Sequence, residues 1–161
     1  MKKIYNCCFV VLFAFCSLSS SYAQLTVDST FSPNLLVQTL LGAGISASNI
    51  TYTGDTTHAS GFFSEPSGAF GVTSGIMLTT GSITNAPGPN NTDFAGFDNL
   101  LPGDALLDQY TTTTLGTNDA CVLEFDFTSI SDSVEFNYVF ASEEYNEFVF
   151  QGFNDVFGFF I

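Results

Sequence analysis

The C-terminal stretch 134–161 constrains the fold most, because two aromatic-rich apolar runs enclose an acidic segment. The runs cover 134–141 and 156–161, and their Phe, Tyr and Val residues favour β-strands. Gly152 and the Asn-Asp pair that soon follows it are typical of a return turn. We therefore expect a strand, an acidic loop and a second strand, with the loop carried at one end of a rigid sheet.

The acidic loop is a candidate metal site, because it gathers carboxylate and amide oxygens. Oxygen ligands of this kind suit Ca²⁺ better than Zn²⁺ or copper. The spacing is not that of an EF-hand, so a second interpretation stays open, in which the carboxylates are solvated, cap turns or accept backbone N–H bonds. Asp93 or Asp98 would reach in from a separate long loop. The expected Ca²⁺ ligands are Glu143, Glu144, Glu147, Asn154 and Asp155.

The balance of charge favours a bound cation, since Lys2 and Lys3 are the only basic residues besides His58. Loss of their two positive charges would change the formal charge from -14 to -16. Two carboxylates ~4 Å apart repel by roughly 4 kcal/mol at an effective dielectric constant of about 20, and a proton or metal ion relieves this repulsion. So large a negative charge argues against nucleic acid and anionic membrane surfaces as partners.

Residues 1–23 have the pattern of a secretory signal peptide. The two lysines give a positive start, 8–18 is an apolar core, and 21–23 is a small-x-small cleavage site. The apolar core is shorter than the ~20 residues that a membrane-spanning helix needs. We expect a secreted or cell-surface domain over 24–161, with no transmembrane segment once the signal is removed.

One cysteine, Cys121, would remain after signal removal, so the expected domain has no internal disulfide. It alternates with Leu123, Phe125 and Phe127, which predicts a half-buried strand over 121–128 and a buried, small apolar role for the thiol. We expect this strand to form an antiparallel hairpin with 134–141. At 161 residues and 45% hydrophobic content, the chain suffices for one domain with a core.

The rest of the chain predicts a β-rich domain with one helix. Ser32 is a good N-cap and Pro33 suits the first helical position, so a short helix should begin there. The Pro- and Gly-rich stretch 85–103 predicts a long loop, and Asp104 should cap a helical turn after it. The fold class is therefore mainly antiparallel all-β, a jelly-roll-like sandwich with one short N-terminal helix. Further strands are expected over 49–53, 60–64 and 75–80.

The chain ends inside the expected strand 156–161, without a turn or a polar tail. A sheet left open there would present an unpaired edge. We therefore expect an incomplete sheet and a domain whose C-terminal part is missing from this sequence.

Five segments taken in order resemble the choice-of-anchor L domain of secreted and surface proteins from Bacteroidota. They read LTVDSTFSPNLLVQTLLGAG, SGIMLTTG, NAPGPNN, NDACVLEFDF and FASEEYNEFVFQGFNDVFGFF, and they begin at Leu25 and end at Phe160. The resemblance implies an N-terminal module of a large exported protein. It also implies cargo of the gliding-associated secretion system, recognised through a C-terminal sorting or anchoring segment that this sequence does not contain.

Three functions fit these features. The first is a non-catalytic surface module for adhesion or surface assembly, ordered by Ca²⁺, with an extracellular glycan or surface protein as partner. The second is a glycoside hydrolase or carbohydrate-binding domain that uses paired carboxylates, Glu144 with Glu147 or Asp155. The third is a structural spacer whose acidity serves solubility alone. No Ser-His-Asp arrangement, zinc motif or phosphate loop supports other chemistry, and we expect no enzyme.

Overall fold

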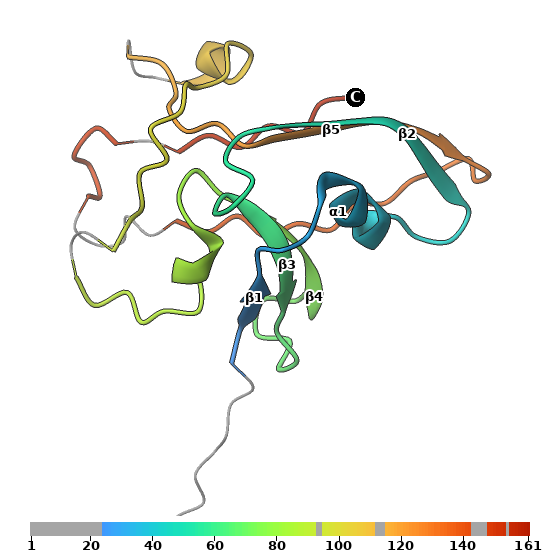
Figure 1. Cartoon of the computed structure of the whole chain (residues 1–161), viewed down its shortest axis with the longest axis horizontal. Helices are drawn as coiled ribbons and strands as arrows, with labels where there is room; N and C mark the ends of the chain where they lie inside the picture. The colour runs from blue at the N-terminus through green and yellow to red at the C-terminus, as the bar shows by residue number, and fades with distance from the viewer. Residues whose placement is uncertain (1–23, 93–94, 112–114, 143–147, 154) are drawn as a thin grey trace, which may run out of the picture.

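The computed structural model describes residues 24–92, 95–111, 115–142, 148–153 and 155–161. Over these residues the chain forms two antiparallel sheets and one short α-helix (Figure 1). The mostly β character expected from the sequence is confirmed. The elements are β1 (Thr26–Asp28), α1 (Pro33–Leu40), β2 (Ile45–Thr53), β3 (Ser60–Ser64), β4 (Ser74–Leu78), β5 (Val122–Ser129) and the 3-10 turns η1 (Ile83–Asn85) and η2 (Leu107–Tyr110).

The first sheet has the order β1-β3-β4, with β3 in the centre. Phe62 of β3 faces Asp28 of β1 on one side and Ile76 of β4 on the other. The bounds of β3 are those predicted from its apolar pattern, and β4 is displaced from the predicted 75–80 by one residue at its start and two at its end. Short strands of this kind gain independent stability only when three or more pair or when a helix covers them.

The second sheet pairs β2 with β5, and this overturns the expected hairpin between 121–128 and 134–141. The strand itself is confirmed, but its partner lies far earlier in the chain, with Ile45 opposite Ser129 and Thr53 opposite Val122. The register shifts between Ser48 and Thr51, where Asn49 adopts a φ of 51°. Alternation indicates which face of a strand is buried, but it does not select the partner strand.

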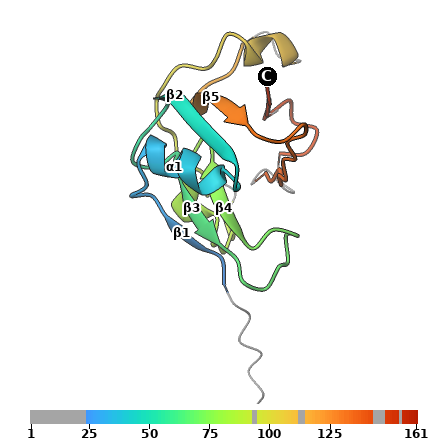
Figure 2. The ribbon, with the colours of Figure 1, turned by 90° about the vertical axis from the view of Figure 1, so that its right-hand side faces the viewer.

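Helix α1 begins as predicted, because the Ser32 side chain accepts a hydrogen bond from the Leu35 N–H at 3.3 Å. Leu36 and Val37 are fully buried, and the helix contacts both β2 and β4. Figures 1 and 2 show α1 at the junction of the two sheets. The helix therefore supplies apolar contact between the two sheets.

Two expected strands, 134–141 and 156–161, are not formed, because the described residues there lie outside both sheets. The predicted loop 85–103 is present after η1, and Asn99 ties it down by donating its side-chain N–H groups to Thr80 O at 2.8 Å and Gly81 O at 2.9 Å. None of the described helices has the length and apolar character that a membrane crossing requires.

Candidate functional site

Most of the residues expected to bind Ca²⁺ lie outside the described part of the chain. This holds for Glu143, Glu144, Glu147, Asn154 and the additional candidate Asp93. Asp155 is described and exposed, whereas the Asp98 carboxylate accepts the backbone N–H of Leu100 at 2.8 Å and so stabilises its own turn. The described residues contain no group of three or more His, Cys, Asp or Glu side chains that would hold a metal ion.

The two segments that flank the acidic loop come together through their aromatic side chains. Phe136 stacks on Phe159 with ring centroids 4.5 Å apart, and Tyr138 stacks on Phe157 at 5.4 Å. Going two residues forward from Phe136 to Tyr138 moves the stacking partner two residues back, from Phe159 to Phe157. The two segments therefore run antiparallel. We call these four residues the aromatic ladder.

The aromatic ladder agrees with one part of the sequence expectation, because the segments on either side of the acidic stretch lie next to each other. The rings pair, although the backbones of the two segments form no strand. Tyr138 is 63% exposed and Phe159 is 55% exposed, so one side of the ladder faces solvent. Phe160 extends this apolar surface to η2 through its contact with Tyr110, at 6.0 Å between ring centroids.

A polar contact joins the two strands of the second sheet near their ends. The Tyr52 hydroxyl lies 3.2 Å from the Cys121 sulfur and donates to the Asp55 carbonyl at 2.8 Å. Burial and the neighbouring thiol raise the pKa of Tyr52. Burial also raises the pKa of the Cys121 thiol, and the hydrogen bond with Tyr52 offsets this only in part. The sequence predicts that Cys121 is a buried, small apolar side chain; it is only partly buried and lies just before β5.

His58 is half-buried and makes contacts with a carboxylate and an aromatic ring. Its Nδ1 lies 3.1 Å from the Asp55 carboxylate, and its ring packs on Phe97 with centroids 4.6 Å apart. Asp55 also accepts the backbone N–H groups of Thr57 and His58, and these bonds, that of His58 first, lower the pKa of the carboxyl. The contact between the His58 ring and the Asp55 carboxylate, together with the two backbone hydrogen bonds, holds the turn between β2 and β3.

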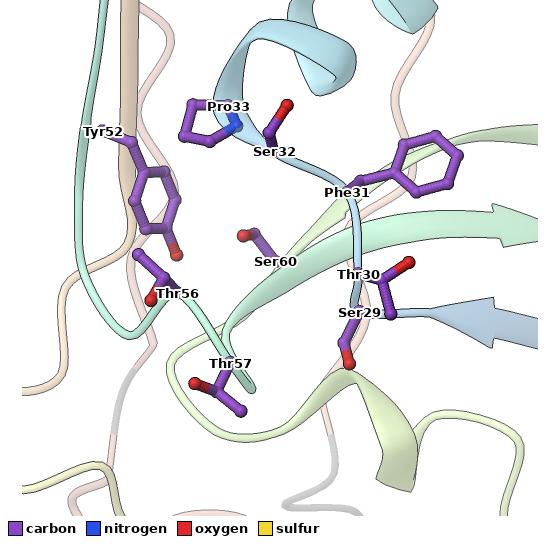
Figure 3. Close-up of a pocket in the computed structure, with 9 residues that line it drawn as sticks. All are labelled: Ser29, Thr30, Phe31, Ser32, Pro33, Tyr52, Thr56, Thr57 and Ser60. Carbon is purple, nitrogen blue, oxygen red and sulfur yellow. The ribbon is translucent and has the colours of Figure 1, made fainter.

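Sequence reasoning missed a cavity where the approach to α1 faces that same turn (Figure 3). We call it the hydroxyl pocket, because most of its lining side chains carry hydroxyl groups. Two opposite walls of the pocket are lined by residues of Asp-x-Thr tripeptides, one starting at Asp28 and the other at Asp55. This repeated signal was available in the sequence, but nothing local to either tripeptide indicates that the two meet.

Two small antiparallel sheets joined by a helix, with exposed aromatic and hydroxyl-bearing surfaces, define a β-rich module with binding surfaces. The sequence model of the choice-of-anchor L domain family matches residues 25–161, so the chain belongs to that family. Such domains are typically found on secreted or surface proteins, and they are not a known enzyme family. No curated protein and no solved structure is similar enough to this chain to count as a match.

Proposed function

We propose that this chain is a non-catalytic module of an exported bacterial protein, used for adhesion or surface assembly. The family match over residues 25–161 is the observation that carries the proposal. The exposed aromatic ladder supports it, because clustered aromatic side chains with one solvent-facing side are enriched where proteins meet partners. The proposal includes a signal peptide over 1–23, an origin in Bacteroidota and a jelly-roll-like sandwich.

Export and surface exposure can be tested on cells that express the full chain. Intact cells are incubated with an antibody against the domain, and the N-terminus of the recovered protein is sequenced. We expect labelling of intact cells and a mature chain that begins at Gln24. Labelling only after lysis, with Lys2 and Lys3 retained, would contradict the proposal. Trypsin is unsuitable for removing the exposed domain, because residues 24–161 contain no Lys or Arg.

A Ca²⁺ ion bound by Glu143, Glu144, Glu147, Asn154 and Asp155 belongs to the same proposal. Its support is chemical: the mature chain has no Lys or Arg to neutralise these groups, and the aromatic ladder brings the two ends of their loop together. Calorimetric titration of the exported protein with Ca²⁺ should give saturable heat, and Ca²⁺ should raise the melting temperature above that in EDTA.

Variants assign any Ca²⁺ effect to the loop. Glu143→Gln combined with Glu144→Gln should abolish the calorimetric heat, because both substitutions remove a negative charge without changing side-chain size. Glu135→Gln is the matched control, since Glu135 is an exposed carboxylate in the same part of the chain. Equal heat in both variants, or no heat in the unaltered protein, would remove Ca²⁺ from the proposal while leaving the surface role intact.

A further inference from the structure

The hydroxyl pocket lies between the N-terminal end of α1 and the turn that follows β2. Its volume is about 330 Å³, at the lower end of the ~300–1,000 Å³ typical of small-molecule pockets. That volume suits a small ligand or one residue of a larger one. Seven of its nine lining residues carry a hydroxyl: Tyr52 and the six residues Ser29, Thr30, Ser32, Thr56, Thr57 and Ser60.

The lining has no charged side chain, and this limits the ligands that suit it. An anion would meet no Lys or Arg anywhere in residues 24–161, and a cation would find no carboxylate in the walls. Hydroxyl groups both donate and accept hydrogen bonds, so they match ligands that do the same. Phe31 and Pro33 add apolar surface on the α1 side (Figure 3).

Several of the hydroxyls are already committed to the protein and give the pocket a fixed shape. Thr30 donates its hydroxyl to the Asp28 carboxylate at 2.7 Å, and the Ser32 oxygen caps α1. Ser60 is only 3% exposed, and Figure 3 shows its hydroxyl on the side that faces the Tyr52 phenol. These bonds hold the side chains in place before any ligand arrives, which lowers the entropy cost of binding.

Other hydroxyls remain available. Within the described part of the chain, the side chains of Ser29, Thr56 and Thr57 make no hydrogen bond. They lie on opposite walls, because Ser29 precedes α1 and the two threonines follow β2. The Asp28 and Asp55 carboxylates accept backbone N–H groups of their own turns at 2.9 Å and 2.7 Å, so each wall is fixed while these hydroxyls stay free.

We propose that the hydroxyl pocket binds a single neutral sugar ring, either a free monosaccharide or the terminal residue of an extracellular glycan. A pyranose presents several hydroxyls that donate and accept, together with apolar C–H faces. The free hydroxyls of Ser29, Thr56 and Thr57 match the former, and Phe31 and Pro33 match the latter. The sugar as a physiological partner rests on the proposed surface function, whereas the pocket itself does not.

The test uses the full chain, recovered after export, and saturation-transfer NMR. The probes are the methyl glycosides of glucose, galactose, mannose and N-acetylglucosamine, with glucuronate as the charged comparator. We expect transfer to at least one neutral sugar and weaker transfer to glucuronate, which the acidic protein repels. Transfer to no neutral sugar at millimolar concentration would overturn the proposal. A neutral trisaccharide ending in the same sugar distinguishes the two sources, because a glycan-binding pocket will retain it.

Matched variants locate the binding. Thr56→Val combined with Thr57→Val removes two hydroxyls at exposed positions with little change in shape, and should weaken sugar binding roughly tenfold. Thr53→Val is the control, because Thr53 is an exposed threonine of β2 that does not line the pocket. If sugar binding weakened equally in the double variant and in Thr53→Val, or weakened in neither, the assignment of the binding site to the hydroxyl pocket would be overturned. Surface labelling without sugar binding would reject this inference alone, and sugar binding without export would reject the proposed function alone.

Discussion

Phe136 and Phe159 stack nearly parallel, with ring centroids 4.5 Å apart and an angle of 17° between the ring planes. They belong to segments on either side of the acidic loop, so their contact closes that loop without any strand pairing. Aromatic pairs of this geometry contribute about 0.5–1.5 kcal/mol beyond the burial of their surface.

A double-mutant cycle with Phe136→Ala and Phe159→Ala should therefore give a coupling free energy of about 0.5–1.5 kcal/mol in denaturant unfolding. Phe150→Ala is the control, because Phe150 is fully exposed, and its loss should change stability by less than about 0.5 kcal/mol. Purely additive effects of the two substitutions at 136 and 159 would show that the stacked pair does not hold the segments together.

The hydrogen-bonded carboxylate of Glu65 leads us to expect that the protein loses stability in acid. The residue is 3% exposed, and its carboxylate accepts the hydroxyl of Ser67 and the backbone N–H of Ala69, the latter at 2.8 Å. The Ser67 hydroxyl is the main reason that the pKa of this carboxyl lies below its ordinary value of 4.5. Because the folded state lowers the pKa, the stabilisation is fully present above pH 4.5 and is lost as the pH falls through the folded value.

The measurement is the melting temperature of the unaltered protein and of Glu65→Gln at pH 7 and at pH 3. We expect the variant to melt at a lower temperature at pH 7, and we expect this difference to be smaller at pH 3, because the stabilisation by the carboxylate declines as the pH falls below 4.5. Glu135→Gln removes one exposed negative charge and should show no such pH-dependent difference. If the difference in melting temperature between Glu65→Gln and the unaltered protein were the same at both pH values, the role assigned to the Glu65 carboxylate would be contradicted.

Local features could be predicted from the sequence, and pairings could not. Ser32 and Pro33 act within their own helix turn, so the start of α1 was correctly placed. The alternation around Phe125 identified β5, but the hairpin expected from sequence proximity lost to a partner, β2, that lies about eighty residues earlier. Chain proximity favours neighbouring strands, whereas β5 pairs with β2, and alternation within a strand does not select its partner.

The candidate sites divide in the same way. The acidic loop could be recognised as a candidate site because its carboxylates are close together in the sequence. Its role as a Ca²⁺ site stays a prediction. The hydroxyl pocket was not evident, because Ser29 and Thr56 come from turns that each look like ordinary connections. Their proximity depends on β1, α1 and β2 being in place together, which no local pattern encodes.

Cys121 should react slowly with alkylating reagents, because the thiolate is the reactive form and burial raises the pKa of this thiol. With iodoacetamide at pH 8, we expect slower modification in the folded protein than in guanidinium chloride. Tyr52→Phe removes a hydrogen bond that lowers the thiol pKa and should slow the reaction further, whereas Tyr138→Phe should not. Rapid modification of the folded protein would show that the thiol is not enclosed as described.

Gly61 is the position where the first sheet tolerates no side chain. It is the second residue of β3, and a Cβ there would collide with the backbone carbonyl of Asp28 in β1 and with Ile83 of η1. Because the colliding group in β1 is backbone, it cannot move aside by a rotamer change. Gly61→Ala should therefore destabilise the protein by about 1–3 kcal/mol, the usual cost of overpacking a core.

Gly42→Ala provides the matched comparison, because a Cβ at Gly42 would meet nothing within 4 Å. Urea unfolding of both variants should show a lower midpoint for Gly61→Ala and a midpoint near or above that of the unaltered protein for Gly42→Ala. A second readout is the state of β1: amide hydrogens of Val27 and Asp28 should exchange faster in Gly61→Ala, since β1 must separate from β3 to admit the methyl group. Unchanged exchange together with an unchanged midpoint would mean that β1 and β3 are not packed as closely as this register requires.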